Sequence, residues 1–353
     1  METDDLFARF WPGSAPMIAV GYDGGTVGLR GEAANHGESL GILSDYYPAS
    51  VQQGDWELGL CASSDALDVI ALAAEMAPGS DDCLSYFRDE IDGDAAVVLA
   101  RGGKRALLFA PPGSRQARMI LARAARTLIL RETLETGWLF VHAACAAFGS
   151  RGVALIGPKR TGKTKTLVSL VAGGWDFVTN DKAALKLRGE ELIGRGFPVS
   201  AGVRPGTIEA LPKVFGTPVA REVLAQYAPD AGGRLVLSPR DLASLGGSRV
   251  RTECEVRAFV TPVFDESCAV ATLELMSPCQ AAATLHENRL DSLAALSRPL
   301  ACLAGLWRPA QPLSTIDDAS NTSKLYYLAP FYVLRQGIQS NARAAQLLAD
   351  VLA

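Results

Sequence analysis

The sequence predicts an α/β protein that carries a phosphate-binding loop in its C-terminal half, and three observations support this fold class. A short apolar run, Val153–Ile156, predicts a buried strand. The segment Gly157–Thr164 follows it and matches the pattern G-x-x-x-x-G-K-[ST] at every fixed position. Residues 167–171 then place apolar side chains at helical spacing. Strand, glycine-bounded loop and helix in this order are the context that the pattern needs.

The loop residues have the chemistry that a nucleotide phosphate requires. Gly157 and Gly162 let the loop turn without a Cβ clash, so backbone N–H groups can converge on a phosphate. The helix start behind them adds partial positive charge. Lys163 can reach the β- and γ-phosphates, and the Thr164 hydroxyl can ligate Mg²⁺. The predicted contacts to ATP are Gly157, Pro158, Lys159, Arg160, Thr161, Gly162, Lys163, Thr164 and Lys165. GTP is not excluded, because no motif specifies the base.

The length and composition indicate a globular protein of two domains. The chain has 353 residues, of which 48% are hydrophobic and 20% charged, enough to build a core. We expect a smaller mixed α+β domain over 1–135, for recognition of a substrate or partner, and the phosphate-loop domain over 136–353. An arginine-rich helix predicted over 114–133 marks the boundary.

Charge and cysteine usage exclude several classes of protein. A net charge of −4 argues against a general nucleic-acid binder. The seven cysteines are widely spaced without a C-x-x-C, which favours a reducing compartment over a disulfide framework or zinc site. The acidic start Met1–Asp5 is unlike a signal peptide, and no apolar run approaches the ~18 residues of a membrane span. We therefore expect a cytoplasmic protein with neither a membrane nor a nucleic-acid partner.

Hydrophobic periodicity and turn residues place the other elements. Segment 196–206 is rich in glycine and proline and predicts loop with short strands, and His36 lies in a polar loop as a surface residue. Strands are expected at 17–20, 26–30, 56–61, 95–100, 105–110, 139–147, 175–181 continuing into 183–187, 234–237, 257–263 and 269–276, and helices at 67–76, 114–133, 279–289, 290–306 and 338–352.

Asp181 is the first candidate for a role beside the loop. It ends the strand predicted over 175–181, which follows the phosphate-loop helix. In a parallel sheet this strand would lie beside the phosphate-loop strand, with its C-terminal end at the phosphates. Asp181 would then hold Mg²⁺ directly or through water. A capping or turn aspartate is the alternative.

Other polar residues near the loop leave two interpretations open. His142 lies in an apolar strand that precedes the loop, either as a site residue or as a satisfied core histidine. Arg195 and Arg204 flank the glycine- and proline-rich segment. Either arginine can clamp a phosphate or an anionic acceptor, or be an ordinary surface residue.

Three segments together resemble the C-terminal domain of the HPr serine kinase/phosphorylase family. They are Val141–Ala144, Gly152–Thr164 and Gly174–Asp181, and the similarity is best over 137–215. The resemblance implies a P-loop kinase domain of the HPr kinase / phosphoenolpyruvate carboxykinase type. It implies transfer of the ATP γ-phosphoryl group to a serine-like hydroxyl of a small molecule or peptide, as in natural-product tailoring. It also places His142 at the active centre, and relatives of this fold often form homo-oligomers. The N-terminal region does not match the bacterial regulator, so HPr is not the expected acceptor.

One departure from the family concerns the residue before Asp181. The family usually has Asp-Asp where this chain has Asn180-Asp181. An asparagine can orient an acceptor by hydrogen bonds but cannot take its proton. Asp181 or His142 could then be the base, the acceptor could need no base, or the chain could bind nucleotide without turnover. The predicted catalytic residues are His142, Lys163, Asn180 and Asp181, and the predicted Mg²⁺ ligands are Thr164 and Asp181. A non-catalytic nucleotide-binding regulatory protein and a P-loop NTP hydrolase are the alternatives.

Overall fold

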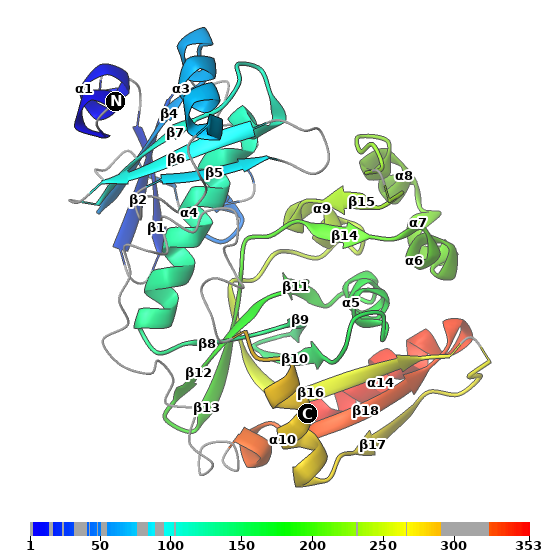
Figure 1. Ribbon diagram of the computed structural model, residues 1–353. Coiled ribbons are helices and arrows are strands. Elements are labelled where there is room, and N and C mark those ends of the chain that lie inside the picture. The colour runs from blue at the N-terminus through cyan, green and yellow to red at the C-terminus, as the bar shows by residue number, and fades with distance from the viewer. Residues whose placement is uncertain are drawn as a thin grey trace. The chain divides into compact units, whose positions relative to one another are not determined.

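The computed structural model in Figure 1 describes most of the chain, and its two compact units are considered one by one. Unit 1 is the described part up to Thr136, and unit 2 is the described part from Gly137 onward. The described residues are 3–13, 17–22, 25–31, 41, 43–47, 49–50, 55–75, 84–88, 95–101, 104–230, 232–265, 267–290 and 325–353. His36 and most of the helix expected at 290–306 lie outside them.

Unit 1 is built on a mixed sheet with helices on both faces. Its described strands form a seven-stranded sheet in the order β3-β1-β2-β4-β7-β6-β5, in which β2, β4 and β7 run parallel. The strands are β1 (Met17–Tyr22), β2 (Gly25–Arg30), β3 (Ala49–Ser50), β4 (Trp56–Cys61), β5 (Leu84–Arg88), β6 (Ala95–Arg101) and β7 (Arg105–Phe109). Helices α1 (Thr3–Phe10) and α3 (Ser64–Glu75) bury apolar side chains such as Phe7 and Ile70 against β6 and β7.

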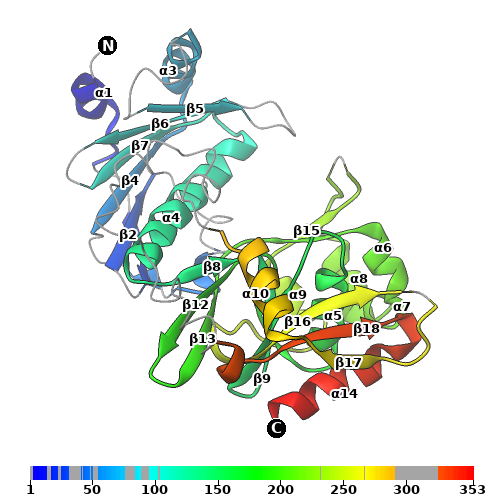
Figure 2. The ribbon, with the colours of Figure 1, turned by 60° about the horizontal axis from the view of Figure 1, so that its bottom comes forward.

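The long helix α4 (Arg115–Glu135) confirms the helix predicted over 114–133. It contacts β2, β4, β6 and β7, and Figure 2 shows it on the face of the sheet opposite α3. Three residues of its apolar stripe, Ile120, Ala124 and Leu128, are fully buried. Burial of this stripe fixes the helix on the sheet, as its spacing predicts.

A buried carboxylate joins three parallel strands of unit 1. Glu57 on β4 faces Arg30 on β2 and Arg105 on β7, with an N–O separation of 3.3 Å to each arginine. The Trp11 ring lies 5.2 Å from the Arg105 guanidinium, and Gly13 accepts a hydrogen bond from Arg30. These contacts attach the segment after α1 to inner strands of the sheet, β2 and β7.

Unit 2 contains a larger mixed sheet, nine-stranded among the described residues. Its main order is β11-β9-β10-β16-β13-β12-β8, and β18 pairs with both β16 and β17. The strands are β8 (Leu139–Val141), β9 (Ala143–Phe148), β10 (Arg151–Ile156), β11 (Asp176–Thr179), β12 (Ala183–Arg188), β13 (Glu191–Gly196), β16 (Glu253–Phe264), β17 (Thr272–Leu275) and β18 (Phe331–Gln336).

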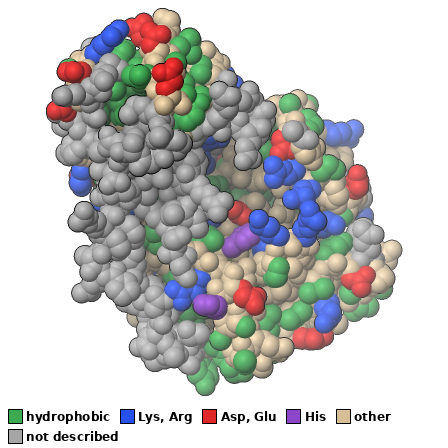
Figure 3. All heavy atoms as spheres, viewed as in Figure 1, with side chains coloured by type: hydrophobic (Ala, Val, Ile, Leu, Met, Phe, Trp, Pro, Cys, Tyr) green, Lys and Arg blue, Asp and Glu red, His purple; other side chains and the backbone are tan. Residues whose placement is uncertain are grey.

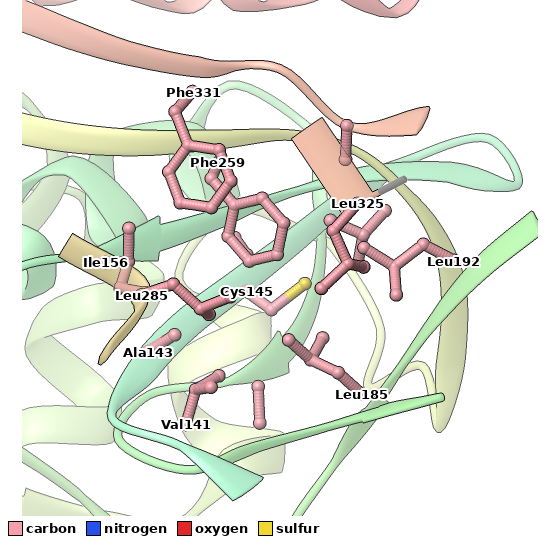
Figure 4. Close-up of a cluster of buried hydrophobic side chains, with 14 of the residues drawn as sticks. Val141, Ala143, Cys145, Ile156, Leu185, Leu192, Phe259, Leu285, Leu325 and Phe331 are labelled. Carbon is pink, nitrogen blue, oxygen red and sulfur yellow. The ribbon is translucent and has the colours of Figure 1, made fainter. Parts of the chain in front are cut away.

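Helices cover both faces of this sheet. Helix α5 (Lys163–Ala172) packs on β9 and β10, and α9 (Pro239–Ser244) and α14 (Asn341–Leu352) pack beside it. Helix α10 (Pro278–Glu287) buries Leu285 in a cluster on the other face, where the Phe259 and Phe331 rings stack. Figure 4 shows this cluster with Val141, Cys145 and Ile156 pointing into it. The strands therefore have cores on both sides, which explains their nearly continuous apolar runs.

A segment of short helices and strands connects β13 to β16. It contains a two-stranded sheet of β14 (Ala201–Val203) and β15 (Leu235–Leu237) and the helices α6 (Pro205–Ala210), α7 (Pro212–Phe215) and α8 (Pro218–Leu224). The 3₁₀ helix η3 (Ile338–Ser340) precedes α14. The prediction of loop with short strands over 196–206 is confirmed at β14.

Two strand predictions in unit 2 are wrong. The run 139–147 is two strands, β8 and β9, which separate at His142 because its backbone N–H bonds Asn288 at 2.7 Å. Strand β12 does not continue β11 but pairs with β8 and β13. Local apolar patterning does not reveal these breaks, because every segment is buried on both sides.

The expected adjacency of the phosphate-loop strand and the strand before Asp181 is also wrong. Strand β9 lies between β10 and β11 and is antiparallel to both. Because β10 and β11 are each antiparallel to β9, they run in the same direction as one another. Their C-terminal ends therefore lie at the same edge of the sheet. Strands β16 and β18, parallel to β10 and to each other, end there too. This edge carries the candidate site.

Candidate nucleotide-binding site

The loop from Gly157 to Gly162 joins β10 to α5 and has a backbone that glycine permits. Gly157 and Gly162 have φ of 138° and 110°, a region that L side chains rarely adopt. A Cβ at Gly157 would lie 3.0 Å from Thr261 Cγ2, and one at Gly162 would lie 3.1 Å from Phe264 Cβ. Because Gly162 also has no side chain with which to cap α5, the first helical amides are left to a ligand. The loop therefore has the backbone of an anion cradle.

Lys163 lies inside the curve of this loop. Its Nζ donates to the carbonyl oxygens of Gly157 at 2.6 Å and Pro158 at 2.9 Å. Burial lowers the pKa of Lys163, the nearby Asp181 carboxylate opposes this shift, and Lys159 adds to it. The ammonium is thus held by neutral carbonyls at the place where phosphate oxygens would be stronger, charged partners.

Thr164 is connected to Asn180. The Thr164 hydroxyl donates to Asn180 Oδ1 at 3.4 Å. A hydroxyl has one hydrogen and two lone pairs. This donation uses the hydrogen, so both lone pairs remain to coordinate a metal ion. Asn180 therefore contacts Thr164, the candidate metal ligand of the loop, and orients its hydroxyl.

Asp181 pairs with His142 across the sheet edge. His142 Nε2 lies 3.0 Å from Asp181 Oδ1. A carboxylate only accepts, so Nε2 carries the hydrogen. This hydrogen bond is the main cause that lowers the pKa of Asp181, burial opposes it, and the charges of His142, Lys182 and Lys163 add to it. Within the described residues Asp181 Oδ2 has no hydrogen bond or ion pair, so an ionised oxygen remains for a ligand.

The structure brings the predicted catalytic and metal-binding residues together at one edge of the sheet. His142, Lys163, Thr164, Asn180 and Asp181 lie at the same sheet edge, and the exposed Lys159 and Arg160 belong to the adjoining loop. The Lys165 ammonium lies 4.0 Å from the Phe264 ring centroid. Lysine and arginine side chains gather on the face of unit 2 seen in Figure 3. Such a face favours an anionic ligand.

Neither arginine candidate is shown to contact the loop. Arg195 donates to Glu253 through Nε at 2.7 Å and lies 4.2 Å from the Trp138 ring, which favours a structural role for Arg195 over the alternative of a clamp. The pairing follows from the register of β13 and β16, which sets Arg195 opposite Glu253. Arg204 is exposed at the start of α6.

Three residues of the loop surroundings were missed by sequence reasoning. Thr261 and Phe264 on β16 contact the two loop glycines. Gln336 at the end of β18 donates to Thr166 Oγ1, which in turn donates to the Gly162 carbonyl at 3.1 Å. They come from strands far along the chain, and only the sheet order places them at the loop.

The residues present fit a Mg²⁺ ion that is held mainly by phosphates. No group of three or more His, Cys, Asp or Glu that could hold a metal occurs among the described residues. Mg²⁺ commonly takes one or two protein oxygens, several waters and substrate phosphates. The Thr164 hydroxyl and Asp181 Oδ2 match that small set.

Comparisons with known proteins show similarity to solved structures. The chain matches no protein-family model, and no curated protein matches it. It is similar to a solved structure of the HPr(Ser) kinase/phosphatase from Coxiella burnetii, with 19% identity and a TM-score of 0.23 over 39% of this chain and 77% of that one. Because both values are low, no property of that protein is transferred to this chain. None of the described helices is long and apolar enough to span a bilayer.

Proposed function

We propose that this protein is an ATP-dependent phosphotransferase that moves the γ-phosphoryl group to a serine-like hydroxyl of a small molecule or peptide. The observation that supports it is the meeting of a complete phosphate loop with the His142–Asp181 pair at one sheet edge. Phosphoryl transfer needs a phosphate cradle, a metal site and a group that orients the acceptor. Each of these has candidate residues there.

The cradle would bind the nucleotide through its phosphates. Loop amides and the start of α5 supply donors, and Lys163 would exchange its two carbonyl partners for phosphate oxygens. All these contacts are to phosphate, so GTP fits them as well as ATP.

Thr164 and Asp181 Oδ2 would hold Mg²⁺. The ion, when bound, neutralises negative charge on the phosphates. Asn180 supports this arrangement because its Oδ1 accepts the hydrogen bond of the Thr164 hydroxyl and leaves the lone pairs of that oxygen for the ion. Its amide adds no charge to the site.

The His142–Asp181 pair would face the acceptor. His142 fixes the orientation of the carboxylate, and Asp181 is the ionised group able to hold or take the acceptor's hydroxyl proton. Asn180 cannot take a proton. Because phosphoryl transfer is loose and mainly electrostatic, a weak base suffices.

The deciding experiment compares wild type with Lys163→Ala. We expect Mg²⁺·ADP and Mg²⁺·ATP to raise the melting temperature of wild type, and the variant to bind roughly 10- to 100-fold more weakly, since a charged hydrogen bond contributes about 1.5–3 kcal/mol. The exposed lysine variant Lys213→Ala is the matched control and should bind normally. Equal binding by Lys163→Ala and wild type would overturn the site.

Transfer is measured with γ-labelled ATP, Mg²⁺, free serine and seryl peptides. We expect label on an acceptor and ADP formation that depends on that acceptor. ADP formed at an equal rate without any acceptor would identify an NTP hydrolase instead.

A second candidate function is nucleotide binding without turnover, in a regulatory protein. It is favoured by the neutral Asn180, which contacts Thr164 where an acid would strengthen the metal site. Nucleotide-dependent stabilisation with neither label transfer nor ADP formation would support it over the kinase.

A further inference from the structure

The hydroxyl of Thr261 is an unusual group beside the phosphate loop. Its Oγ1 is buried and has no hydrogen-bond partner within the part of the chain that the structure describes. Buried hydroxyls are nearly always paired, because an unpaired one has lost its water without compensation. Such a group at a candidate site calls for a partner that arrives with a ligand.

The sheet register places Thr261 at the start of the loop. Strand β16 is the parallel neighbour of β10, with Leu155 opposite Val260. Thr261 is therefore level with Ile156 and adjacent to Gly157. The point where a Gly157 Cβ would stand lies 3.7 Å from both Thr261 Oγ1 and Thr161 Oγ1. The hydroxyl thus belongs to the wall of the loop.

The hydroxyls of Thr161 and Thr166 and the ammonium of Lys163, also beside the loop, have internal partners. Thr161 Oγ1 donates to the Pro158 carbonyl at 3.1 Å, and Thr166 Oγ1 donates to Gly162 and receives from Gln336. Lys163 Nζ occupies the carbonyls of Gly157 and Pro158.

We propose that Thr261 is a nucleotide-positioning residue whose hydroxyl donates to a phosphate oxygen of the bound nucleotide. The inference rests on the proposed nucleotide site and adds a residue of β16 to it. Binding gives the buried hydroxyl its missing partner, so the nucleotide gains a contact that the free protein forgoes. The hydrogen bond of Thr261 on β16 is then present only when a nucleotide occupies the phosphate loop.

The test replaces Thr261 by valine, which keeps the branched shape and removes the hydroxyl. The nucleotide-free variant should melt at or above the wild-type temperature, because an unpaired buried hydroxyl is gone. Its Kd for Mg²⁺·ADP and Mg²⁺·ATP should rise about tenfold, the loss expected for one hydrogen bond to a charged group. A role in packing alone would not move these two quantities in opposite directions.

Ser169→Ala is the matched control. Ser169 Oγ on α5 is also buried and unpartnered among the described residues, but it lies farther along the helix from the loop. Its removal should leave both Kd values unchanged. Thr261→Ser restores a hydroxyl and should recover most of the affinity that Thr261→Ala loses, which keeps the test decisive if the valine variant fails to fold.

The outcomes separate this inference from the proposed function. Wild-type affinity in Thr261→Val, or no recovery in Thr261→Ser relative to Thr261→Ala, would overturn the role of Thr261 while Lys163→Ala still loses binding. No nucleotide binding by the wild-type protein would overturn both.

Discussion

Each unit of the protein contains a carboxylate that pairs with basic side chains: Glu57 in unit 1 and Asp181 in unit 2. The two carboxylates differ in whether both of their oxygens are paired. In unit 1, both oxygens of Glu57 face arginines, and its side chain is 6% exposed. Among the described residues of unit 2, only Oδ1 of Asp181 is paired, and the Asp181 side chain is 53% exposed. Both carboxylates pair with nitrogen donors, but Asp181 keeps one oxygen that no described residue pairs.

This difference separates the two kinds of site: the Glu57 ion pairs are structural, and the Asp181 pair belongs to a candidate binding site. A buried charge is tolerated only when it is paired, and both oxygens of Glu57 have an arginine nitrogen at 3.3 Å, with Oε1 accepting a hydrogen bond from Arg30. The Asp181 pair contributes little to stability because it is half exposed, but it holds one carboxylate in a defined orientation. Because the Asp181 charge contributes little to stability, a functional role for it is favoured over a structural one.

The largest expected effect is that of Asp181→Asn on phosphoryl transfer. Removing the negative charge should slow transfer by roughly 10²- to 10⁴-fold, the usual contribution of a positioned acid–base group. The free energy of unfolding should change by less than about 1 kcal/mol. The measurements are the rate of acceptor-dependent ADP formation and urea denaturation.

Asp176→Asn, at the start of the β11 strand that precedes Asp181, is the control. Asp176 accepts from Arg251 at 2.9 Å and from Arg249 at 3.2 Å, an ion cluster with a structural role. This variant should lose stability and keep its rate of transfer. If the two aspartates behaved alike, the distinction between the two kinds of site would fail.

A smaller effect is expected from Glu57→Gln, which leaves two arginines beside a neutral amide. We expect a loss of about 3 kcal/mol in the free energy of unfolding, the lower end for a broken buried pair because Arg105 is 48% exposed. Urea denaturation measures it, with Arg105→Gln as the milder comparison at under about 1 kcal/mol. Equal losses in both variants would show that Glu57 is not the centre of the cluster.

The smallest expected effect is that of Asn180→Asp, which adds a charge next to Thr164. The Mg²⁺ concentration that gives half of the ADP-dependent thermal shift should fall about tenfold, as a nearby charge in a partly solvated site contributes somewhat over 1 kcal/mol. The same variant should gain hydrolase activity. Asn180→Ala, which adds no charge, should not increase the affinity for Mg²⁺. An unchanged Mg²⁺ dependence in Asn180→Asp would remove Asn180 from the metal side of the site.

Several elements were predictable because their signals are local. Helix α4 shows an apolar stripe over many turns, and α10 begins with a capping Ser277 that bonds the backbone of Gln280. The loop glycines have the positive φ that their motif requires. By contrast, the break of β8 from β9 at His142 depends on the Asn288 carbonyl, a partner far along the chain.

The sequence by itself determined the phosphate loop, its helix and the identity of the polar side chains near it, because these depend on neighbours within a few residues. Only the tertiary structure decided that β9 separates β10 from β11, that His142 bonds Asp181 while Asn180 bonds Thr164, and that Thr261 lies against Gly157. The physical reason is that strand order and register are set by packing of the whole sheet between its two helix layers. A buried apolar strand carries no local mark of which neighbour it will pair with.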